Sequence, residues 1–242
     1  LSLKSTDFLI ELNLVIGWGT RVKDRPRILA LFYTGYGSGE YRLQSPLRVL
    51  AHEALLEESI YVIKEGRTDN YPSHFEIHRM EPDIILMHQM VDDGANDFLT
   101  MLKQEFNIFT IFGIDDLVEE VPDKSSQKRV VYRDMRHRIR HNFALCDRVI
   151  VSTQPIADAY KELNDDIVVV PNYLESWRWC ELPSFQKKIR TDKPRVGWAG
   201  AKQHDGDLEV IFDVVKETSE EVTWVFFGMC PDEIKPYVEE IH

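Results

Sequence analysis

From Arg27 onward, short apolar runs alternate with longer segments in which apolar residues recur at helical spacing. Runs rich in β-branched and aromatic residues predict strands, and a spacing of three to four residues predicts amphipathic helices. The runs that predict the strands of a first domain are 28–34, 59–63, 83–88, 108–113, 148–153 and 166–171. Such alternation is typical of βαβ units around a parallel sheet. The sequence therefore predicts an α/β fold with a Rossmann-like first domain.

Capping residues predict where the helices between these strands begin. The expected starts are Ser45, the neighbourhood of Pro72, Asp93 or Gly94, Ser125 or Ser126, and Thr153. Ser, Thr and Asp side chains accept hydrogen bonds from the free amides at a helix start, and proline fits the first turn because its missing N–H has no partner there. The predicted helices and strands therefore support each other.

The alternation stops after Pro171 and resumes in a second, shorter stretch. Strands are expected at 195–200 and 222–228, with a helix from His204 or Asp205 to about Lys216 and another helix start at Pro231. Two βα units cannot cover both faces of a sheet, so we expect the chain to belong to a longer protein with further domains. The expected organisation is an extension or linker (1–25), a Rossmann-like domain (26–174), a linker (175–193) and a truncated second Rossmann-like domain (194–242).

Composition excludes some classes of protein. The formal net charge of -12 disfavours nucleic acid as a partner, because nucleic acid binding normally requires a positive surface. The cysteines, Cys146, Cys180 and Cys230, are far apart, which argues against a disulfide framework or a thiolate metal site and favours a cytoplasmic location. No run of 18 or more apolar residues occurs, so no membrane-spanning segment is expected.

One segment is locally basic despite the acidic total. It contains Lys128, Arg129, Arg133, Arg136, His137, Arg138, Arg140 and His141. At helical spacing these side chains surround the helix, which favours a solvated or salt-bridged helix. The alternative is contact with anionic lipid at the inner face of the membrane or with an anionic substrate.

A glycine-rich segment, "TGYGSGEYR" (34–42), follows the first predicted strand. It is no dinucleotide fingerprint, since Glu40 stands where G-x-G-x-x-G requires glycine. Either it is a flexible turn, or its glycines let the backbone approach a ligand closely. In the second case Gly37, Gly39, Tyr41 and Arg42 become candidates for binding an acceptor, since a tyrosine ring can stack on a sugar and a guanidinium can bind sugar or phosphate.

Two further polar segments follow predicted strands at the same edge of the sheet. Asp115 and Asp116 come directly after the fourth strand, and one of them could act as a base toward an acceptor hydroxyl if its pKa were raised. The alternative is a helix cap beside a solvated acid. After the third strand, His88, Gln89 and Asp92 are either crevice-lining groups or ordinary loop and capping residues, and His88 is the acceptor-binding candidate among them.

The segment "VGWAGAKQHDGDLEVI" (196–211) predicts an anion site in the second domain. A strand ends in a small-residue turn and a helix follows, so free helix N–H groups would face a phosphate. The candidate donor-binding residues are Gly200, Ala201, Lys202, His204 and Asp207. His204 and Asp207 alone do not make a metal site, and no metal is expected.

Four segments together resemble one family. "GIDDLVEEVP", "CDRVIVSTQPIADAY", "IVVVPNYLE" and "VGWAGAKQHDGDL" are similar, in order and spacing, to segments of GT-B fold glycosyltransferases of the family 4 kind. The resemblance covers 27–242 and implies a GT-B type fold, with one complete Rossmann-like domain and the start of a second.

The resemblance also implies a function. It is transfer of a sugar from a nucleoside diphosphate sugar to a glycan, lipid-linked or other acceptor hydroxyl, without an essential metal, as in polysaccharide biosynthesis. The donor phosphates would lie at Gly200, Ala201 and Lys202. The family's later E-x7-E donor motif does not occur before His242, so the fragment could be inactive alone. The alternatives are a noncatalytic sugar- or partner-binding module of the same fold, and an NAD-dependent Rossmann enzyme acting on nucleotide sugars.

Overall fold

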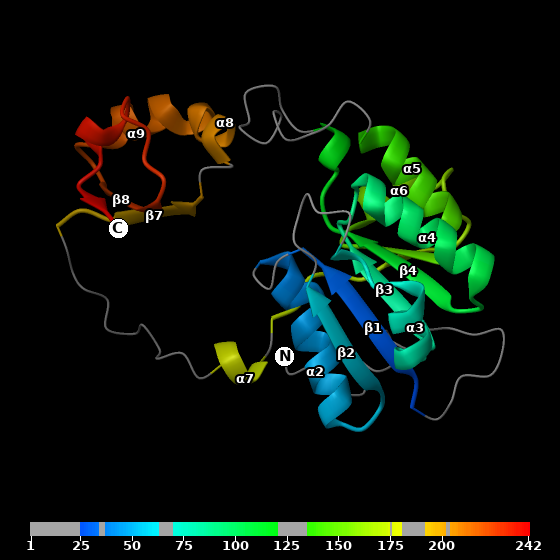
Figure 1. Ribbon diagram of the computed structural model, residues 1–242. Helices are drawn as coiled ribbons and strands as arrows, with labels where there is room; N and C mark the ends of the chain where they lie inside the picture. Colours follow the sequence, from blue (N-terminus) through cyan, green and yellow to red (C-terminus); the bar gives the residue numbers. More distant parts are fainter. Residues whose placement is uncertain are drawn as a thin grey trace. The chain divides into compact units, whose positions relative to one another are not determined.

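The computed structural model describes residues 25–33, 37–62, 70–120, 135–174, 176–180, 192–201 and 204–242. Within these residues the chain divides into two compact units, each built on its own parallel sheet (Figure 1). Both units are of the α/β class with parallel, Rossmann-like sheets, as the alternation of apolar runs predicts. The domain boundaries at 174 and 194 stay predictions.

The first unit contains a six-stranded parallel sheet of order β2-β1-β3-β4-β5-β6. Its strands are β1 (Arg27–Phe32), β2 (Glu57–Val62), β3 (Ile84–His88), β4 (Phe109–Ile114), β5 (Arg148–Val151) and β6 (Ile167–Val169). All six predicted strands exist, with ends within a few residues of the expected ones. The order reverses between β1 and β3, and ligands of doubly wound sheets bind at such a switch point, beyond the carboxyl ends of the strands.

Four helices of the first unit begin close to where capping residues predict, and they are α2 (Ser45–His52), α3 (His74–Met80), α4 (Asp93–Glu105) and α6 (Gln154–Tyr160). The unit also contains α5 (Met135–Leu145) and the short α7 (Ser176–Trp179), and α7 lies in the stretch that was predicted to be a linker. Ser73 and Glu76 form a capping box at the start of α3, and Asp92 accepts a hydrogen bond from the N–H of Ala95 at the start of α4. The start predicted at Ser125 or Ser126 lies outside the described residues.

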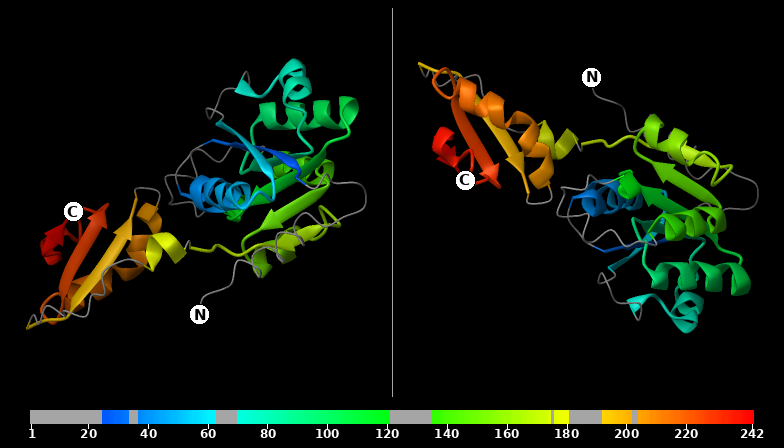
Figure 2. Two further views of the ribbon diagram at one scale, coloured as in Figure 1. Left: turned by 90° about the horizontal axis from the view of Figure 1, so that it is seen from below. Right: turned by 90° about the horizontal axis from the view of Figure 1, so that it is seen from above.

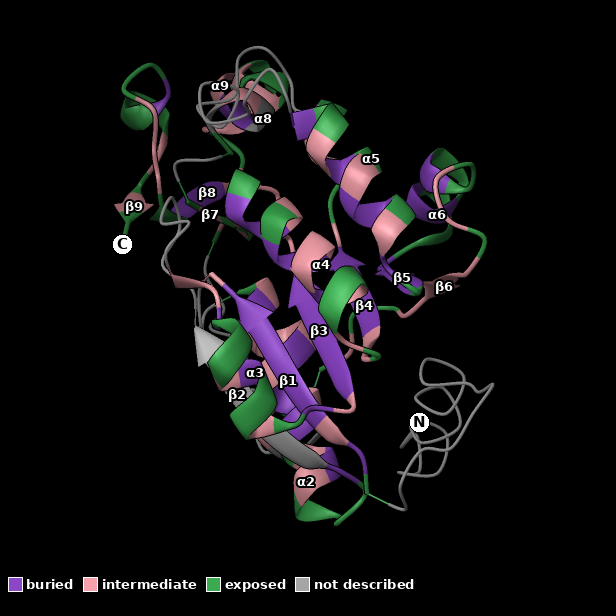
Figure 3. Cartoon of the chain, turned by 45° about the vertical axis from the view of Figure 1, so that its right-hand side comes forward, coloured by how far each residue is buried: buried purple, intermediate pink, exposed green. Residues whose placement is uncertain are grey.

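Both faces of this sheet are covered (Figure 2). Ile28, Ala30 and Phe32 of β1 pack with Leu47 and Leu50 of α2 on one face. On the other, the ring of Phe112 in β4 contacts Phe143 of α5, which in turn contacts Tyr160 of α6. Figure 3 shows α4 and α5 lying across this second face, above strands that are buried along their length. Burial on both faces explains why the strands read as continuous apolar runs.

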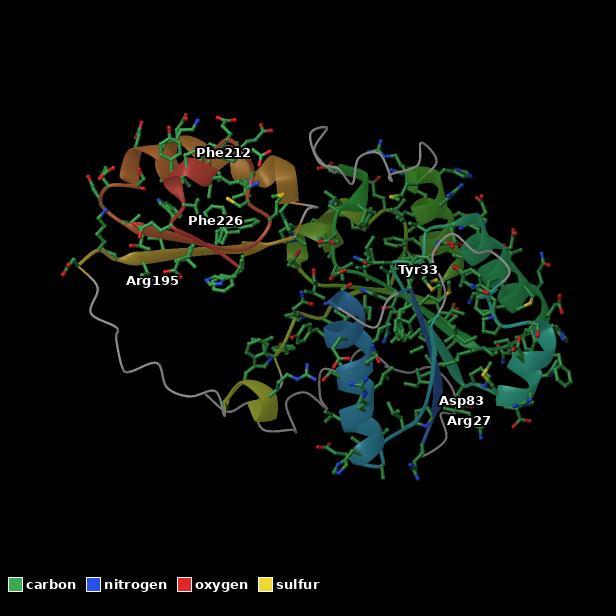
Figure 4. All side chains as sticks on the ribbon, turned by 60° about the vertical axis from the view of Figure 1, so that its left-hand side comes forward. Arg27, Tyr33, Asp83, Arg195, Phe212 and Phe226 are labelled. Atoms are coloured by element: carbon green, nitrogen blue, oxygen red, sulfur yellow. The ribbon has the colours of Figure 1, made fainter. Side chains whose placement is uncertain are left out.

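Polar groups mark the two ends of the sheet. At the amino end, Asp83 accepts a hydrogen bond from the N–H of Arg27 at 2.8 Å, and Tyr33 lies at the opposite end of β1 (Figure 4). The guanidinium of Arg27 donates to the carbonyl oxygen of Met80 at 2.8 Å. These bonds join the starts of β1 and β3 and leave the carboxyl end for the candidate site.

The second unit contains a three-stranded parallel sheet of order β7-β8-β9. Its elements are β7 (Arg195–Gly200), α8 (Asp205–Leu208), a 3-10 turn (Glu209–Ile211), α9 (Phe212–Thr218), β8 (Thr223–Gly228), a 3-10 turn (Lys235–Tyr237) and β9 (Glu240–Ile241). Phe226 is fully buried among residues of both the strands and the helices (Figure 4).

One prediction for this unit is wrong, and one strand was not predicted. No α-helix follows Pro231 in the described chain. A turn and a short 3-10 segment lead instead into β9, which the sequence analysis did not predict. A two-residue strand carries too little alternation to be recognised, and Pro236 lies inside the short helical turn.

The helical segments that the structure describes include none long and apolar enough to cross a membrane. In the basic segment, Arg138 of α5 forms an ion pair with Asp93 of α4 at 2.9 Å, as expected of a salt-bridged helix. Lys128, Arg129 and Arg133 lie outside the described residues.

Candidate functional site at the carboxyl edge of the first sheet

The candidate site is built at the ends of β3 and β4. His88 is the last residue of β3 and pairs with Gly113 of β4, so Gln89 and Asp115 leave the sheet side by side. Because the carboxyl ends of parallel strands share one edge, residues predicted from separate segments come together here. The structure thus joins His88, Asp115 and Asp116, three of the predicted site residues.

His88 is buried without a hydrogen bond to its ring. Its side chain is 3% exposed, and neither ring nitrogen has a hydrogen-bond partner in the described structure. Burial and the nearby charge of Arg42 lower the pKa of His88 to about 3. Buried polar atoms normally have partners, so the two unsatisfied nitrogens of this neutral imidazole make His88 a candidate for contact with a ligand group or water.

Asp115 is the carboxyl group next to this ring. Its Oδ1 lies 3.5 Å from Nε2 of His88, and its side chain is 12% exposed. Burial, together with the charge of Asp116, raises the pKa of Asp115 to about 6, and Arg42 opposes this shift. A carboxylate with such a pKa can accept a proton at neutral pH more readily than a solvated aspartate.

Gln89 connects the two carboxyl groups. Its Nε2 donates to Oδ1 of Asp115 at 2.5 Å and lies 3.5 Å from Oδ2 of Asp116. The backbone of Gln89 is left-handed, with φ 53°, which is uncommon for any residue but glycine, asparagine or aspartate. Sequence reasoning placed Gln89 in the crevice without separating it from a loop residue, since no sequence signal marks a left-handed glutamine.

The described part of the glycine-rich segment is helical from Ser38 onward, and not the flexible turn that one interpretation predicts, whereas its contact with a ligand stays a prediction. Gly37 has φ 55°, the helix starts at Ser38, and Gly39 adopts right-handed helical angles before a π-helical turn (Glu40–Gln44). Tyr41 is half-buried in that turn. Residues 34–36, which include Gly35, lie outside the described residues.

Arg42 points toward the end of β6. Its Nη1 donates to the carbonyl oxygen of Val170 at 3.0 Å and to Oδ1 of Asn172 at 2.6 Å, while its buried Nε has no hydrogen-bond partner. Burial lowers the pKa of Arg42. The guanidinium therefore supplies a fixed positive charge that acts on both His88 and Asp115.

Further residues support the site, and sequence reasoning missed most of them. Oγ of Ser152, just beyond β5, donates to the backbone oxygen of Asp115 at 2.9 Å. Beside the site, Asp92 accepts hydrogen bonds from the hydroxyl groups of Tyr33 at 2.5 Å and Tyr71 at 3.0 Å. The periodicity of the sequence could not show that Tyr33, which follows β1, and Tyr71, which follows β2, both donate hydrogen bonds to Asp92, the N-cap of α4.

The predicted donor-binding residues lie in the second unit. Gly200 ends β7, Ala201 is exposed, and the N–H of exposed His204 donates to the oxygen of Ala201 at 3.0 Å. Lys202 lies outside the described residues, as does the side chain of Asp207, whose backbone belongs to α8. Their role in donor binding stays a prediction.

Gly200 has a structural reason to be glycine. A Cβ there would lie 2.4 Å from Cζ2 of Trp198. Its strand partner Gly228 has φ 94°, and a Cβ there would lie 2.5 Å from the oxygen of Gly200. These contacts account for both glycines without a ligand.

The described residues include no group of three or more His, Cys, Asp or Glu side chains arranged to hold a metal ion. That no metal is needed stays a prediction.

Comparison with known proteins adds little to this geometry. The chain is similar to the solved structure titled "Crystal Structure Analysis of the Glycotransferase of kitacinnamycin", with a TM-score of 0.44 and 12% identical residues, over 90% of this chain and 71% of that chain. Neither a protein-family profile nor a curated protein matches the sequence. The α/β assignment therefore rests on the strand order and register described above.

Proposed function

We propose that the protein is a GT-B type glycosyltransferase that transfers a sugar from a nucleoside diphosphate sugar to an acceptor hydroxyl. The observation that carries the proposal is the pairing of Asp115, whose pKa is raised to about 6, with His88, whose buried ring nitrogens lack partners. A carboxylate that takes up a proton near neutral pH, beside an unsatisfied neutral ring, suits a hydroxyl that must be held and deprotonated.

The acceptor hydroxyl would bind beside His88 and Asp115, in contact with both groups, since the 3.5 Å between Nε2 and Oδ1 leaves no space for an oxygen between them. Neutral imidazole has one N–H and one bare nitrogen, so His88 would hydrogen-bond the hydroxyl oxygen while the hydroxyl donates to Asp115. As the oxygen attacks the anomeric carbon of the donor sugar, its proton passes to Asp115. The bond from that carbon to the diphosphate oxygen breaks, and the diphosphate leaves with the bonding electrons.

Arg42 would tune this site electrostatically. Its guanidinium is held by Val170 and Asn172, and its charge favours the ionised form of Asp115 and the neutral form of His88. Both effects favour the protonation states that proton transfer requires. Gly37, Gly39 and Tyr41 would line the acceptor side from the segment that follows β1.

The donor would bind through the second unit, at Gly200, Ala201, Lys202, His204 and Asp207. Support for this half comes from the resemblance of 196–208 to family 4 sequences and from the small-residue turn after β7. The acceptor would be a glycan, a lipid-linked sugar or another hydroxyl compound, and we propose a cytoplasmic location, peripheral to the inner face of the membrane if the basic segment meets anionic lipid.

Donor turnover followed by mass spectrometry tests the proposal. UDP-glucose, UDP-N-acetylglucosamine and GDP-mannose are incubated with the protein, and release of UDP or GDP is measured for the wild type and for Asp115→Asn. We expect release by the wild type and a loss of about 100-fold or more in the variant, typical of removing a general base.

Two outcomes would favour the alternatives. Fluorescence enhancement on titration with NADH, without turnover of any nucleotide sugar, would indicate an NAD-dependent enzyme. The failed G-x-G-x-x-G spacing at 35–40 counts against it. Saturable sugar binding without turnover would indicate a noncatalytic module.

A further inference from the structure

Gln89 adopts a backbone conformation that its side chain does not favour. Its φ of 53° lies in the left-handed region, where residues with a Cβ are disfavoured, yet its N–H still donates to the oxygen of Gly113 at 2.9 Å. Such conformations persist where the surrounding structure holds them, and they cluster at functional sites. The position follows His88 directly, at the carboxyl end of β3.

The side-chain amide of Gln89 faces two acceptors. Carboxylate oxygens only accept hydrogen bonds, so the amide nitrogen is the atom that faces Asp115 and Asp116, at 2.5 Å and 3.5 Å. The amide oxygen lies 3.5 Å from Oγ of Ser38, which donates to it. The amide is therefore oriented from both ends.

This contact distinguishes the two oxygens of Asp115. Oδ1 accepts from Gln89 and lies 3.5 Å from Nε2 of His88. Among the hydrogen bonds of the described residues, none reaches Oδ2. The carboxyl group is thus anchored by one oxygen and open at the other.

We infer that Gln89 is a positioning residue, which anchors Oδ1 of Asp115 so that Oδ2 receives the proton of the acceptor hydroxyl. This role rests on the proposed function. Gln89 takes no part in bond making: the O–H bond of the acceptor breaks, the proton joins Oδ2, and the oxygen lone pair forms the new glycosidic bond. A misplacement of the base by about 1 Å can cost about 100-fold in rate.

The left-handed backbone supplies a matched control. Replacing Gln89 by glycine relieves the backbone strain and removes the amide, whereas Ala54→Gly relieves comparable strain, at φ 59°, in an exposed turn after α2. Any effect of Gln89→Gly that Ala54→Gly lacks belongs to the side-chain amide. Gln89→Leu removes the amide and keeps a side chain of similar length.

The first readout is the titration of Asp115, followed through the carboxyl carbon in protein labelled with ¹³C-aspartate and assigned by its absence in Asp115→Asn. A donated hydrogen bond favours the ionised carboxylate, so we expect both Gln89 variants to raise the pKa of Asp115 by about one unit. Ala54→Gly should leave the titration unchanged. If the pKa of Asp115 is the same in both Gln89 variants as in the wild type, the inference is overturned.

The second readout is turnover of the same three nucleotide sugars. We expect Gln89→Gly and Gln89→Leu to lower kcat about 10-fold to 100-fold with KM nearly unchanged. The acid limb of the pH profile of kcat/KM should move to higher pH, because the pKa of Asp115 rises. A raised pKa of Asp115 in variants that keep the wild-type kcat would contradict the positioning role. Absence of turnover by the wild type, with the titration behaving as expected, would contradict the proposed function instead.

Discussion

The ring of His88 and the carboxyl group of Asp115 lie 3.5 Å apart, and burial shifts their pKa values in opposite directions, to about 3 for His88 and about 6 for Asp115, so that the usual order of the two values is reversed. Each shift disfavours the charged form. Between these values both groups are uncharged, and above pH 6 a neutral imidazole faces a carboxylate. The pair is therefore no ion pair at neutral pH, although its atoms are at ion-pair distance.

The pH dependence of transfer follows from this relationship. The base must be ionised, so kcat/KM should rise with pH and level off above about 6. Asp116→Asn removes a charge that raises the pKa of Asp115, so this variant should move the acid limb to lower pH. A profile that is flat from pH 4.5 to 8, or a limb that Asp116→Asn moves upward, would contradict the role of Asp115.

Asp115 should lower the stability of the fold at neutral pH. Its pKa is about 6 in the folded chain and near 3.8 when solvated, so the folded state binds the proton more tightly and stability falls as pH rises from about 4 to 6. Two pKa units correspond to about 3 kcal/mol. Urea denaturation should show Asp115→Asn more stable than the wild type by up to that amount at pH 8 and nearly equal to it at pH 3.5.

Gly113 sets the space available to the ring of His88. A Cβ at this position would lie 3.0 Å from Nδ1 of His88 and 3.4 Å from Cγ1 of Ile150, so Gly113→Ala should displace the ring and cost about 1–3 kcal/mol. Gly197→Ala is the matched control in a strand, because its nearest contact would be the oxygen of Val225 at 4.0 Å. Equal unfolding free energies for the two variants would show that a Cβ at position 113 does not crowd the ring of His88.

Asp92 should be the common partner of two phenols. Tyr33→Phe and Tyr71→Phe should each cost about 1 kcal/mol, and the double variant should cost less than the sum, because both hydroxyl groups bond the same carboxylate and lie 3.5 Å apart. Asp92→Ala, which also removes the cap of α4, should cost more than either single change. Strict additivity in the double-mutant cycle would show that the phenols act independently.

Gly200 tests packing separately from donor binding. Gly200→Ala should displace the ring of Trp198, which we expect to appear as a change in tryptophan fluorescence and as a loss of about 1–3 kcal/mol in unfolding free energy. Ala201→Ser changes an exposed neighbour and is the control, which should keep the wild-type tryptophan fluorescence and unfolding free energy. Loss of turnover in Gly200→Ala alone would therefore not locate the donor phosphates.

The sequence predicted the strands well and the site only in part, for physical reasons. Strands such as β3 and β4 are buried on both faces, so their apolar runs are visible in the sequence, and Asp115 follows at a predictable edge. The three glycines after β1 favoured a loop, yet Ser38 and Gly39 are helical, because glycine permits that conformation as readily as others.

Tertiary contacts of the site were beyond reach of local patterns. Arg42 bonds Asn172 across 130 positions, and no local pattern places a residue that follows β1 beside one that follows β6. The left-handed backbone of Gln89 has no signal in residue type, since glutamine seldom adopts it. Both features depend on the three-dimensional structure and not on local sequence.

The position of β1 between β2 and β3 has a consequence for how the protein folds. β1 pairs with β3 in the register of Ile28 with Ile84, so this contact joins residues that are far apart in the chain, and β3 in turn pairs with β4, the strand that leads to Asp115. Contacts of large sequence separation slow folding, because loop closure must precede the stabilisation that they bring. The raised pKa of Asp115 should therefore develop late in refolding. The carboxyl group can then serve as a kinetic reporter of sheet completion.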